Sequence, residues 1–348
     1  MKAVVYENFG APLIVTHVPD PVLIDNAAII KVMASGICRS DFHGWLGRDP
    51  DINNLPHVPG HEFAGIVEVV GKKIRKWKVG DRVTVPFVCG CGECPECKSG
   101  NSQICDFQFQ PGFTHWGSFA QYVSIEYADT NLVLLPEEVD FVTAASLGCR
   151  FSTAYRACIE QANITSGKWV AVHGCGGVGL SAIMIANAIG ARVIAIDINS
   201  DVLELAKSLG AEVLINAEDQ SDIIDVIRKI TDHGADVSID ALGSVETCTN
   251  SILCLRKRGR HIQVGLLVGE DYQPRIPMDQ VISKELQIFG SHGMQANKYD
   301  EMLNKICSGQ LNPGLLIGKK ISLDEVPQEM ERMNGFGGMG ITVIDRFE

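Results

Sequence analysis

The pattern of hydrophobic and polar positions divides the chain into two parts of different character. Up to about residue 85, short runs rich in Val and Ile alternate with turns that contain Gly, Pro or Asp, a pattern typical of strands. Strands are expected over residues 2–6, 28–34, 64–71 and 79–85, with a further strand over 117–123. A short helix is expected to begin near Ser40. Closely spaced strands of this kind indicate a small, partly closed β-barrel.

From about Phe151 onward, apolar strands alternate with helical segments, which is the signature of a doubly wound parallel sheet. The expected strands cover residues 168–173, 192–197, 236–240, 261–265 and 286–289, with a helix over about 178–189. These are five of the strands of an expected six-stranded dinucleotide-binding domain. We therefore expect an α/β protein in which residues 151–289 form a Rossmann domain inserted into a barrel domain of residues 1–150 and 290–348.

Length and charge narrow the range of functions. The 348 residues are too many for one core, and 46% hydrophobic with 21% charged residues is ordinary for a soluble globular protein. A formal net charge of −12 makes nucleic acid and anionic membranes poor partners. The N-terminal residues lack the apolar run of a signal peptide, and no apolar stretch is long enough to span a membrane. We expect a cytoplasmic protein.

The cysteines give the strongest local signal. Cys91, Cys94, Cys97 and Cys105 have the spacing C-x2-C-x2-C-x7-C, with Gly and Pro between them. Four thiolates form a closed tetrahedral zinc site, which stabilises a lobe of the fold, here about residues 89–106, and leaves no position open for chemistry. An iron–sulfur cluster is the alternative metal group, and a chance cluster of free thiols is the alternative without metal.

A second group of metal-binding residue types surrounds Cys38. The stretch Cys38–His43 carries a thiol, a basic group, a hydroxyl, a carboxylate and an imidazole, and His61 and Glu62 follow after a Pro-rich loop. Zinc prefers thiolate and imidazole ligands. A surface loop with a buried cysteine and an unrelated histidine is the alternative when this stretch is considered alone.

A glycine-rich loop marks the nucleotide site. The segment 174–179 fits G-x-G-x-x-G, lies between an expected strand and an expected helix, and is followed by a strand that ends in Asp197. In this context the glycines allow a pyrophosphate to approach the backbone, and the helix N-terminus offers free N–H groups. Asp197 would bind the adenosine ribose and repel a 2′-phosphate, which favours NAD over NADP. A helix N-cap is the alternative role for Asp197.

Taken together and in this order, the motifs resemble those of the zinc-containing medium-chain alcohol dehydrogenases. The resemblance extends from the N-terminus to the last expected strand, over residues 341–344, and includes Gly36–His43, Pro59–Gly65 and Gly148–Thr153. It implies a GroES-like catalytic domain interrupted by a Rossmann domain. It also implies two zinc ions per chain and reversible hydride transfer between an alcohol and NAD, which yields an aldehyde or a ketone. Homotetramers are common among members of this length, so a homo-oligomer is expected by analogy.

The resemblance assigns roles to individual residues. It makes Cys38, His61 and Cys149 the catalytic zinc ligands, although a lone thiol such as Cys149 is otherwise a typical core residue. Asp41 would orient His61, with a helix-start acid as its alternative role. Glu62 would approach the metal transiently or be an ion-pair partner. Ser40 and His43 would move the alcohol proton to solvent, and an exposed helix histidine is the alternative for His43.

The resemblance also implies which residues contact the cofactor. They are Arg39 at the pyrophosphate, Gly174, Gly176, Gly177, Val178 and Gly179 in the loop, and Thr153, Val178 and Val264 near the nicotinamide. Phe87 matches a substrate-pocket aromatic residue. Trp45 and Trp116 are further pocket candidates for which core packing is the alternative. The chain departs from many relatives in having no Arg between Gly338 and Thr342, so pyrophosphate binding is expected to depend more on Arg39 and the backbone.

Three other functions are alternatives to an alcohol dehydrogenase. A sorbitol-like polyol dehydrogenase shares the scaffold, but such enzymes tend to replace the third thiolate with Glu, which Cys149 argues against. Quinone-reductase-like or crystallin-like members without metal lack the Cys/His ligand set that is present here. A regulatory module that uses the cysteine lobe for recognition does not explain the dinucleotide motif. The sequence leaves the identity of the alcohol open.

Overall fold

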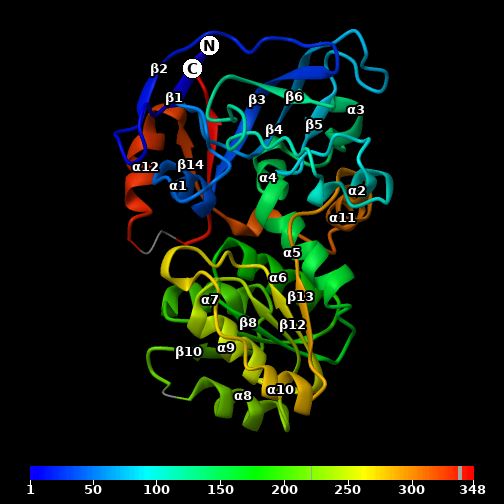
Figure 1. Cartoon of the computed structure of the whole chain (residues 1–348), viewed down its shortest axis with the longest axis vertical. Helices are drawn as coiled ribbons and strands as arrows, with labels where there is room; N and C mark the ends of the chain where they lie inside the picture. Colours follow the sequence, from blue (N-terminus) through cyan, green and yellow to red (C-terminus); the bar gives the residue numbers. More distant parts are fainter. Residues whose placement is uncertain (221, 336–338) are drawn as a thin grey trace. The chain divides into compact units, whose positions relative to one another are not determined.

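The structure is a computed structural model that describes residues 1–220, 222–335 and 339–348. Gly338, which belongs to the segment without an Arg noted above, lies outside the described residues. The described chain forms two compact units, one of Met1–Ser152 with Gly293–Glu348 and the other of Thr153–His292. Each unit is described by itself below (Figure 1).

The first unit is built around one long strand, β3 (Ala27–Ile37). It pairs antiparallel with β4 (Glu62–Val70), β6 (Tyr122–Glu126) and β15 (Ile341–Arg346). The seven-stranded sheet of the described residues is completed by β5 (Arg82–Thr84), β7 (Val133–Leu134) and β14 (Ile317–Ser322), while β1 (Lys2–Val5) and β2 (Ile14–His17) form a separate hairpin. Because β15 pairs with β3, the C-terminal segment of the chain belongs to the same sheet as the N-terminal segment (Figure 1).

The helices of this unit are short, and most of them fill the spaces between strands. They are α1 (Arg39–Trp45), α2 (Pro95–Lys98), α3 (Ala128–Asn131), α4 (Phe141–Ala145), α11 (Tyr299–Cys307) and α12 (Val326–Arg332). A π-helical turn, Leu147–Phe151, follows α4 and leads into α5 (Ser152–Arg156). The buried apolar side chains form two clusters, one that includes Tyr6, Phe42 and Trp45 and another that includes Phe63, Val67 and Val123.

The second unit holds a six-stranded parallel sheet in its described residues, with the order β10-β9-β8-β11-β12-β13. The strands are β8 (Trp169–His173), β9 (Arg192–Asp197), β10 (Val213–Asn216), β11 (Ala235–Asp240), β12 (Leu255–Gln263) and β13 (Gln287–Gly290). The helices are α6 (Gly177–Ala188), α7 (Ser200–Ser208), α8 (Ile223–Thr231), α9 (Val245–Leu253) and α10 (Met278–Ser283).

The strand order reverses at β8, which has β9 on one side and β11 on the other. All five residues of β8 are buried, as expected for a strand that is covered on both faces. Ligands of such open sheets bind beyond the carboxyl ends of the strands at this reversal point. The expected α/β fold with a Rossmann-type sheet is thus confirmed.

Several elements differ from the sequence-based expectations, among them β10, β12 and β6. β10 was not expected, and β12 begins at Leu255, earlier than expected, because the charged run Arg256–Arg260 hides its first half. The strand expected over 117–123 lies at Tyr122–Glu126, since the preceding Ala120 makes only an isolated bridge with Ala3. Within the part of the chain that the structure describes, no helix combines the length and the apolar character needed to cross a membrane.

Candidate functional site

The structure gathers Cys91, Cys94, Cys97 and Cys105 into one cluster whose ligand atoms all lie within 4.8 Å of one another. Backbone N–H groups point at these sulfurs: those of Cys94 and Phe107 lie 3.3 Å from the sulfurs of Cys91 and Cys105. A hydrogen bond from the Cys97 N–H is the main cause that lowers the pKa of Cys94 to about 6. Thiolates that accept N–H bonds and converge on one centre fit a four-coordinate zinc ion.

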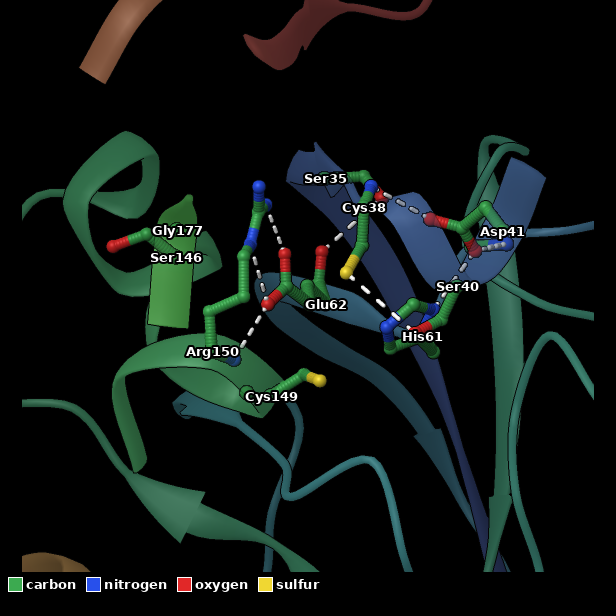
Figure 2. A network of polar contacts seen from close by, with 12 residues as sticks. Ser35, Cys38, Ser40, Asp41, His61, Glu62, Ser146, Cys149, Arg150 and Gly177 are labelled. Atoms are coloured by element: carbon green, nitrogen blue, oxygen red, sulfur yellow. Dashed lines mark hydrogen bonds and ion pairs between the residues drawn. The ribbon is translucent and has the colours of Figure 1, made fainter. Parts of the chain in front are cut away.

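Cys38, His61, Glu62 and Cys149 form a second cluster in the first unit, again with all ligand atoms within 4.8 Å of one another. The sheet register explains why Cys38 and His61 lie close together. Cys38 directly follows β3, His61 directly precedes β4, and Gly36 pairs with Glu62 across the two strands. Antiparallel pairing therefore brings Cys38 and His61 to the same end of the sheet. Cys149 comes from the π-helical turn Leu147–Phe151 (Figure 2).

Asp41 fixes the orientation of His61. Its Oδ1 atom lies 2.8 Å from Nδ1 of His61 and also accepts the N–H of Gly60, while Oδ2 accepts the N–H of Cys38 at 2.9 Å. The second ring nitrogen of His61, Nε2, is buried and has no nitrogen or oxygen partner among the described residues. Figure 2 shows the His61 ring facing the Cys38 sulfur. A buried nitrogen without a partner beside two sulfurs is what a bound zinc ion would satisfy.

The charges around Cys38 favour its thiolate. A hydrogen bond from Cys149, together with the nearby Arg150 and His61, holds the pKa of Cys38 well below its ordinary value against the opposing effect of burial. Cys38 is only 5% exposed. A thiolate is the form of cysteine that binds metal. The residues of this cluster therefore fit a zinc ion bound by two cysteine sulfurs and one imidazole.

Glu62 is held by Arg150, a residue for which no role was predicted. The Arg150 side chain binds both carboxylate oxygens of Glu62, with Nε 3.0 Å from Oε1, and the backbone N–H of Arg150 lies 2.9 Å from the same oxygen (Figure 2). Both side chains are buried. Gly36 makes room for the pair, because a Cβ atom there would lie 2.8 Å from Oε2 of Glu62. This geometry matches the ion-pair alternative for Glu62.

The other residues of the Cys38–His43 stretch lie on α1. Ser40 is half-buried, with Oγ 3.9 Å from the Cys38 sulfur. His43 is half-buried, and its Nδ1 lies 3.5 Å from Nη1 of Arg48. Burial, and then repulsion from Arg39 and Arg48, lower the pKa of His43, so its ring stays neutral to a lower pH than an ordinary histidine. Arg39 is exposed, binds the carbonyl oxygen of Met333 and lies over the Phe42 ring.

Two aromatic rings flank His61. The Phe87 ring centroid lies 6.1 Å from that of His61, and Phe113, which the sequence did not indicate, lies 4.8 Å away. Trp45 instead packs on Phe42 in the core, with its indole nitrogen on the carbonyl of Ala11, which matches the core-packing alternative.

Trp116 lies in a different place. Its indole nitrogen donates to Pro56, and it lines a surface cavity of about 370 Å³ together with His57, Phe109 and His115.

The glycine-rich loop of the second unit connects β8 with α6. A Cβ atom at Gly179 would lie 1.9 Å from the carbonyl oxygen of Gly174, so only glycine allows this close turn. Gly176 is the N-cap of α6 without a side-chain cap, and a Cβ there would meet nothing within 4 Å. Gly177 and Val178 form the first turn of this helix. Uncapped N–H groups beside open space fit the pyrophosphate of a dinucleotide.

Asp197 ends β9, and its two carboxylate oxygens accept the N–H groups of Cys175 and Asn199 at 2.6 and 2.9 Å. The carboxylate therefore lies against the glycine-rich loop rather than capping a helix, and Asn199 is the N-cap of α7. Thr153 carries a buried Oγ1 without a partner among the described residues, and Val264 directly follows β12. These positions fit a cofactor bound at the carboxyl ends of β8 and β9.

Comparison with known proteins identifies the family. Residues 24–137 match the model of the alcohol dehydrogenase GroES-like domain, and residues 177–308 match that of the zinc-binding dehydrogenases. An alcohol dehydrogenase of Geobacillus stearothermophilus is 33% identical over 84% of this chain and 84% of its own length. Alcohol dehydrogenase 2 of Caenorhabditis elegans is 31% identical over 99% of this chain and 96% of its own.

Solved structures agree with these relatives. The alcohol dehydrogenase TADH from Thermus sp. ATN1 superposes with a TM-score of 0.89 at 32% sequence identity, which covers 99% of this chain and 100% of that one. The alcohol dehydrogenase of Aeropyrum pernix also gives a TM-score of 0.89, at 27% identity. With both family models matched in order and relatives that cover nearly the whole chain, this protein belongs to the zinc-containing medium-chain alcohol dehydrogenase family, the members of which are oxidoreductases.

Proposed function

We propose that the protein oxidises a primary or secondary alcohol to an aldehyde or ketone, reversibly, with NAD as the hydride acceptor, at a zinc ion held by Cys38, His61 and Cys149. The observation that carries the proposal is the cluster of the buried Cys38 and His61 with the half-buried Cys149, in which Asp41 leaves Nε2 of His61 available. Three protein ligands are the number that leaves one coordination position for a substrate. A second zinc ion in the lobe of Cys91, Cys94, Cys97 and Cys105 stabilises the fold.

The cofactors supply the electronic part of the chemistry: zinc is a Lewis acid that lowers the pKa of a bound alcohol, and NAD accepts the hydride. The chain's residues supply position and charge. Two thiolates offset the charge of a dication, and Asp41 holds His61 in one tautomer. Phe87 and Phe113 give the surroundings of His61 an apolar surface that suits the carbon chain of an alcohol.

Proton transfer is assigned to Ser40 and His43. Ser40, beside the Cys38 sulfur, accepts the hydroxyl proton of the substrate while it gives up its own, and the imidazole of His43 passes the released proton to solvent. A neutral ring is required for this step, and the lowered pKa of His43 keeps it neutral at mildly acidic pH. Glu62 carries a carboxylate beside the proposed metal ligands, and Arg150 holds that carboxylate in a buried ion pair.

The cofactor site is assigned to the second unit. The loop Gly174–Gly179 and the start of α6 bind the pyrophosphate, Asp197 binds the adenosine ribose, and Thr153, Val178 and Val264 line the nicotinamide site. Arg39 is assigned to the pyrophosphate as a further cationic contact. On this assignment, Met1–Ser152 with Gly293–Glu348 is the catalytic domain and Thr153–His292 is the NAD-binding domain.

The proposal includes the cellular compartment and the oligomeric state of the protein. All twelve cysteines, every one among the described residues, are free thiols, and thiolate zinc sites require reduced cysteines. We therefore assign the protein to the cytoplasm and, by analogy with family members of this length, to a homotetramer. Sedimentation of the purified protein tests the assembly, and a mass of one or two chains would contradict it.

The activity is tested with the zinc-loaded full chain. Primary, secondary, aromatic and polyol alcohols are each combined with NAD or NADP, and the absorbance of reduced nicotinamide is followed. We expect turnover of a monohydric alcohol with NAD and two zinc ions per chain. Absence of turnover with every alcohol, in protein that contains both zinc ions, would refute the proposed reaction, and preference for a polyol would favour the sorbitol-like alternative.

A further inference from the structure

Within the described part of this acidic chain, a strongly basic cavity lies at the opposite end of the Rossmann-type sheet from the glycine-rich loop. A cavity of about 350 Å³ is lined by Lys168, Arg256, Arg258 and Arg260, with Asp236 as the only carboxylate among its lining residues. Its wall thus has a formal charge of +3 in a chain whose net charge is −12. The size lies in the range of cavities that bind small ligands.

The backbone builds this cavity through an irregularity in β12. Ala235 of β11 pairs with Leu255, whereas Val237 pairs with Arg260, so the four residues 256–259 of β12 lie opposite the single residue Asp236. Arg258 adopts a φ of +62° in this bulge, a conformation that is uncommon for a residue with a side chain. The bulge displaces Arg256 and Arg258 from the regular ladder and brings both to the cavity wall.

The cations are only partly neutralised by protein groups. Asp236 is shared by two of them: it lies 2.8 Å from Nε of Arg256 and 3.2 Å from Nζ of Lys168. Arg260 donates to the carbonyl oxygen of Ala162. Arg258 is 75% exposed, and its Nε is 3.9 Å from Glu285, a carboxylate that is itself 78% exposed. A contact this long and this exposed contributes little, so Arg258 can bind another anion.

Neighbouring groups strengthen the positive field. Lys284 lies behind Leu255, with its ammonium 3.5 Å from that residue's carbonyl oxygen. Burial, and then repulsion from Arg228, lower the pKa of Lys284, which agrees with an excess of positive charge in this region. Asn163, Thr165 and Gln287 also line the cavity and carry neutral hydrogen-bonding groups. Arg guanidinium groups with such neighbours are the usual components of sites that bind phosphate oxygens.

We propose that this cavity is a binding site for a small phosphate-bearing molecule, separate from the dinucleotide site. Lys168 immediately precedes β8 and the glycine-rich loop immediately follows it, so the five-residue strand separates the two sites by about 15 Å. A phosphate in the cavity would contact the loop of residues 162–165, β11 and β12 through its lining residues. It would thereby stabilise the second unit without competing with NAD.

The proposal is tested by thermal unfolding of the zinc-loaded full chain at saturating NAD. Inorganic phosphate and glycerol 3-phosphate are titrated separately, with sodium chloride added to keep the ionic strength constant. We expect a saturable rise of the unfolding midpoint. The compound that binds with the higher affinity, inorganic phosphate or glycerol 3-phosphate, shows whether the site prefers free phosphate or a phosphate monoester. Arg258→Gln should weaken phosphate affinity about tenfold, as measured by calorimetric titration. Lys168→Gln should have a similar effect.

Lys229→Gln is the matched control, because it removes one exposed positive charge of the same unit at α8, outside the cavity. It should leave phosphate affinity within about twofold of the unmodified chain, as expected for a distant screened charge. Equal responses of Arg258→Gln and Lys229→Gln, or a midpoint that follows ionic strength alone, would overturn the proposal. Binding of a short single-stranded oligonucleotide without binding of either phosphate compound would overturn it as well.

Discussion

The Nδ1 atom of His61 lies 2.8 Å from Oδ1 of Asp41, and both side chains are buried. The same carboxylate accepts the N–H groups of Cys38 and Gly60, so one side chain organises both loops that supply proposed zinc ligands. Outer-shell partners of this kind set the tautomer and the direction of a metal-binding histidine.

Asp41→Asn should therefore reduce the zinc affinity of the Cys38 site by about 10- to 100-fold. The amide keeps one acceptor for the backbone N–H groups but loses the charge that fixes the His61 tautomer. Competition with a chromophoric zinc chelator measures the loss. Asp51→Asn, on the neighbouring loop, is the control and should retain zinc as tightly as the unmodified chain.

Single cysteine replacements should separate the two zinc ions. Cys38→Ala should retain one zinc ion and lose alcohol oxidation, whereas Cys94→Ala should lose the other ion and at least about 3 kcal/mol of stability. Elemental analysis and denaturant unfolding provide the two readouts. Cys89→Ala removes a buried thiol that belongs to neither cluster, and should retain both ions at a cost of about 1 kcal/mol. Loss of zinc from this control would contradict the assigned ligand sets.

Arg150→Ala should lower the free energy of unfolding by about 3–5 kcal/mol, because it leaves the buried carboxylate of Glu62 without its partner. Arg346→Ala breaks only exposed ion pairs and should cost less than about 1 kcal/mol. Chemical denaturation measures both. The double change Glu62→Gln with Arg150→Met should cost less than the sum of the single changes, and strict additivity would argue against a coupled pair.

His43→Gln should slow alcohol oxidation most at low pH, where few other bases are available to take the proton. The unmodified enzyme should keep its activity below the ordinary histidine pKa, since burial, Arg39 and Arg48 lower the pKa of His43. Arg48→Gln removes one of these positive charges, which raises the His43 pKa and should move the acidic limb of kcat/KM to higher pH. An unchanged pH profile in both variants would remove His43 from the proton path.

Asp197→Asn should shift cofactor preference toward NADP. The amide oxygen still accepts a backbone N–H, while the charge that repels a 2′-phosphate is gone. We expect the ratio of kcat/KM for NADP to that for NAD to rise at least about tenfold, since a like-charge contact costs several kcal/mol. Steady-state kinetics with both cofactors checks this. If the preference for NAD persists, Asp197 supports only the glycine-rich loop.

Local signals in the sequence were enough to predict the position of the nucleotide site. The glycines of 174–179 and the acid at Asp197 mark it because a strand, a loop and a helix follow one another directly, and the structure has β8, α6 and β9 at those places. The four cysteines of the lobe are similarly close in sequence, and their spacing alone indicated a shared metal. Both predictions depend on short-range geometry.

Longer-range geometry was harder to predict. Glu62 and Arg150 are 88 positions apart, and their contact depends on how the π-helical turn meets β4, which no residue pattern encodes. Phe113 reaches His61 from a loop without a motif. The start of β12 was missed because its charged residues line a cavity at the sheet edge, where hydrophobic periodicity fails.

The π-helical turn Leu147–Phe151 has an evolutionary consequence. Such a turn arises when one extra residue enters an α-helix, and it closes hydrogen bonds five residues apart instead of four. Loss of a single codon within it would restore an α-helix and rotate the side chain at position 149 by about 100° relative to the preceding helix. One in-frame deletion in this segment would therefore remove the third proposed metal ligand from its position without replacing the cysteine.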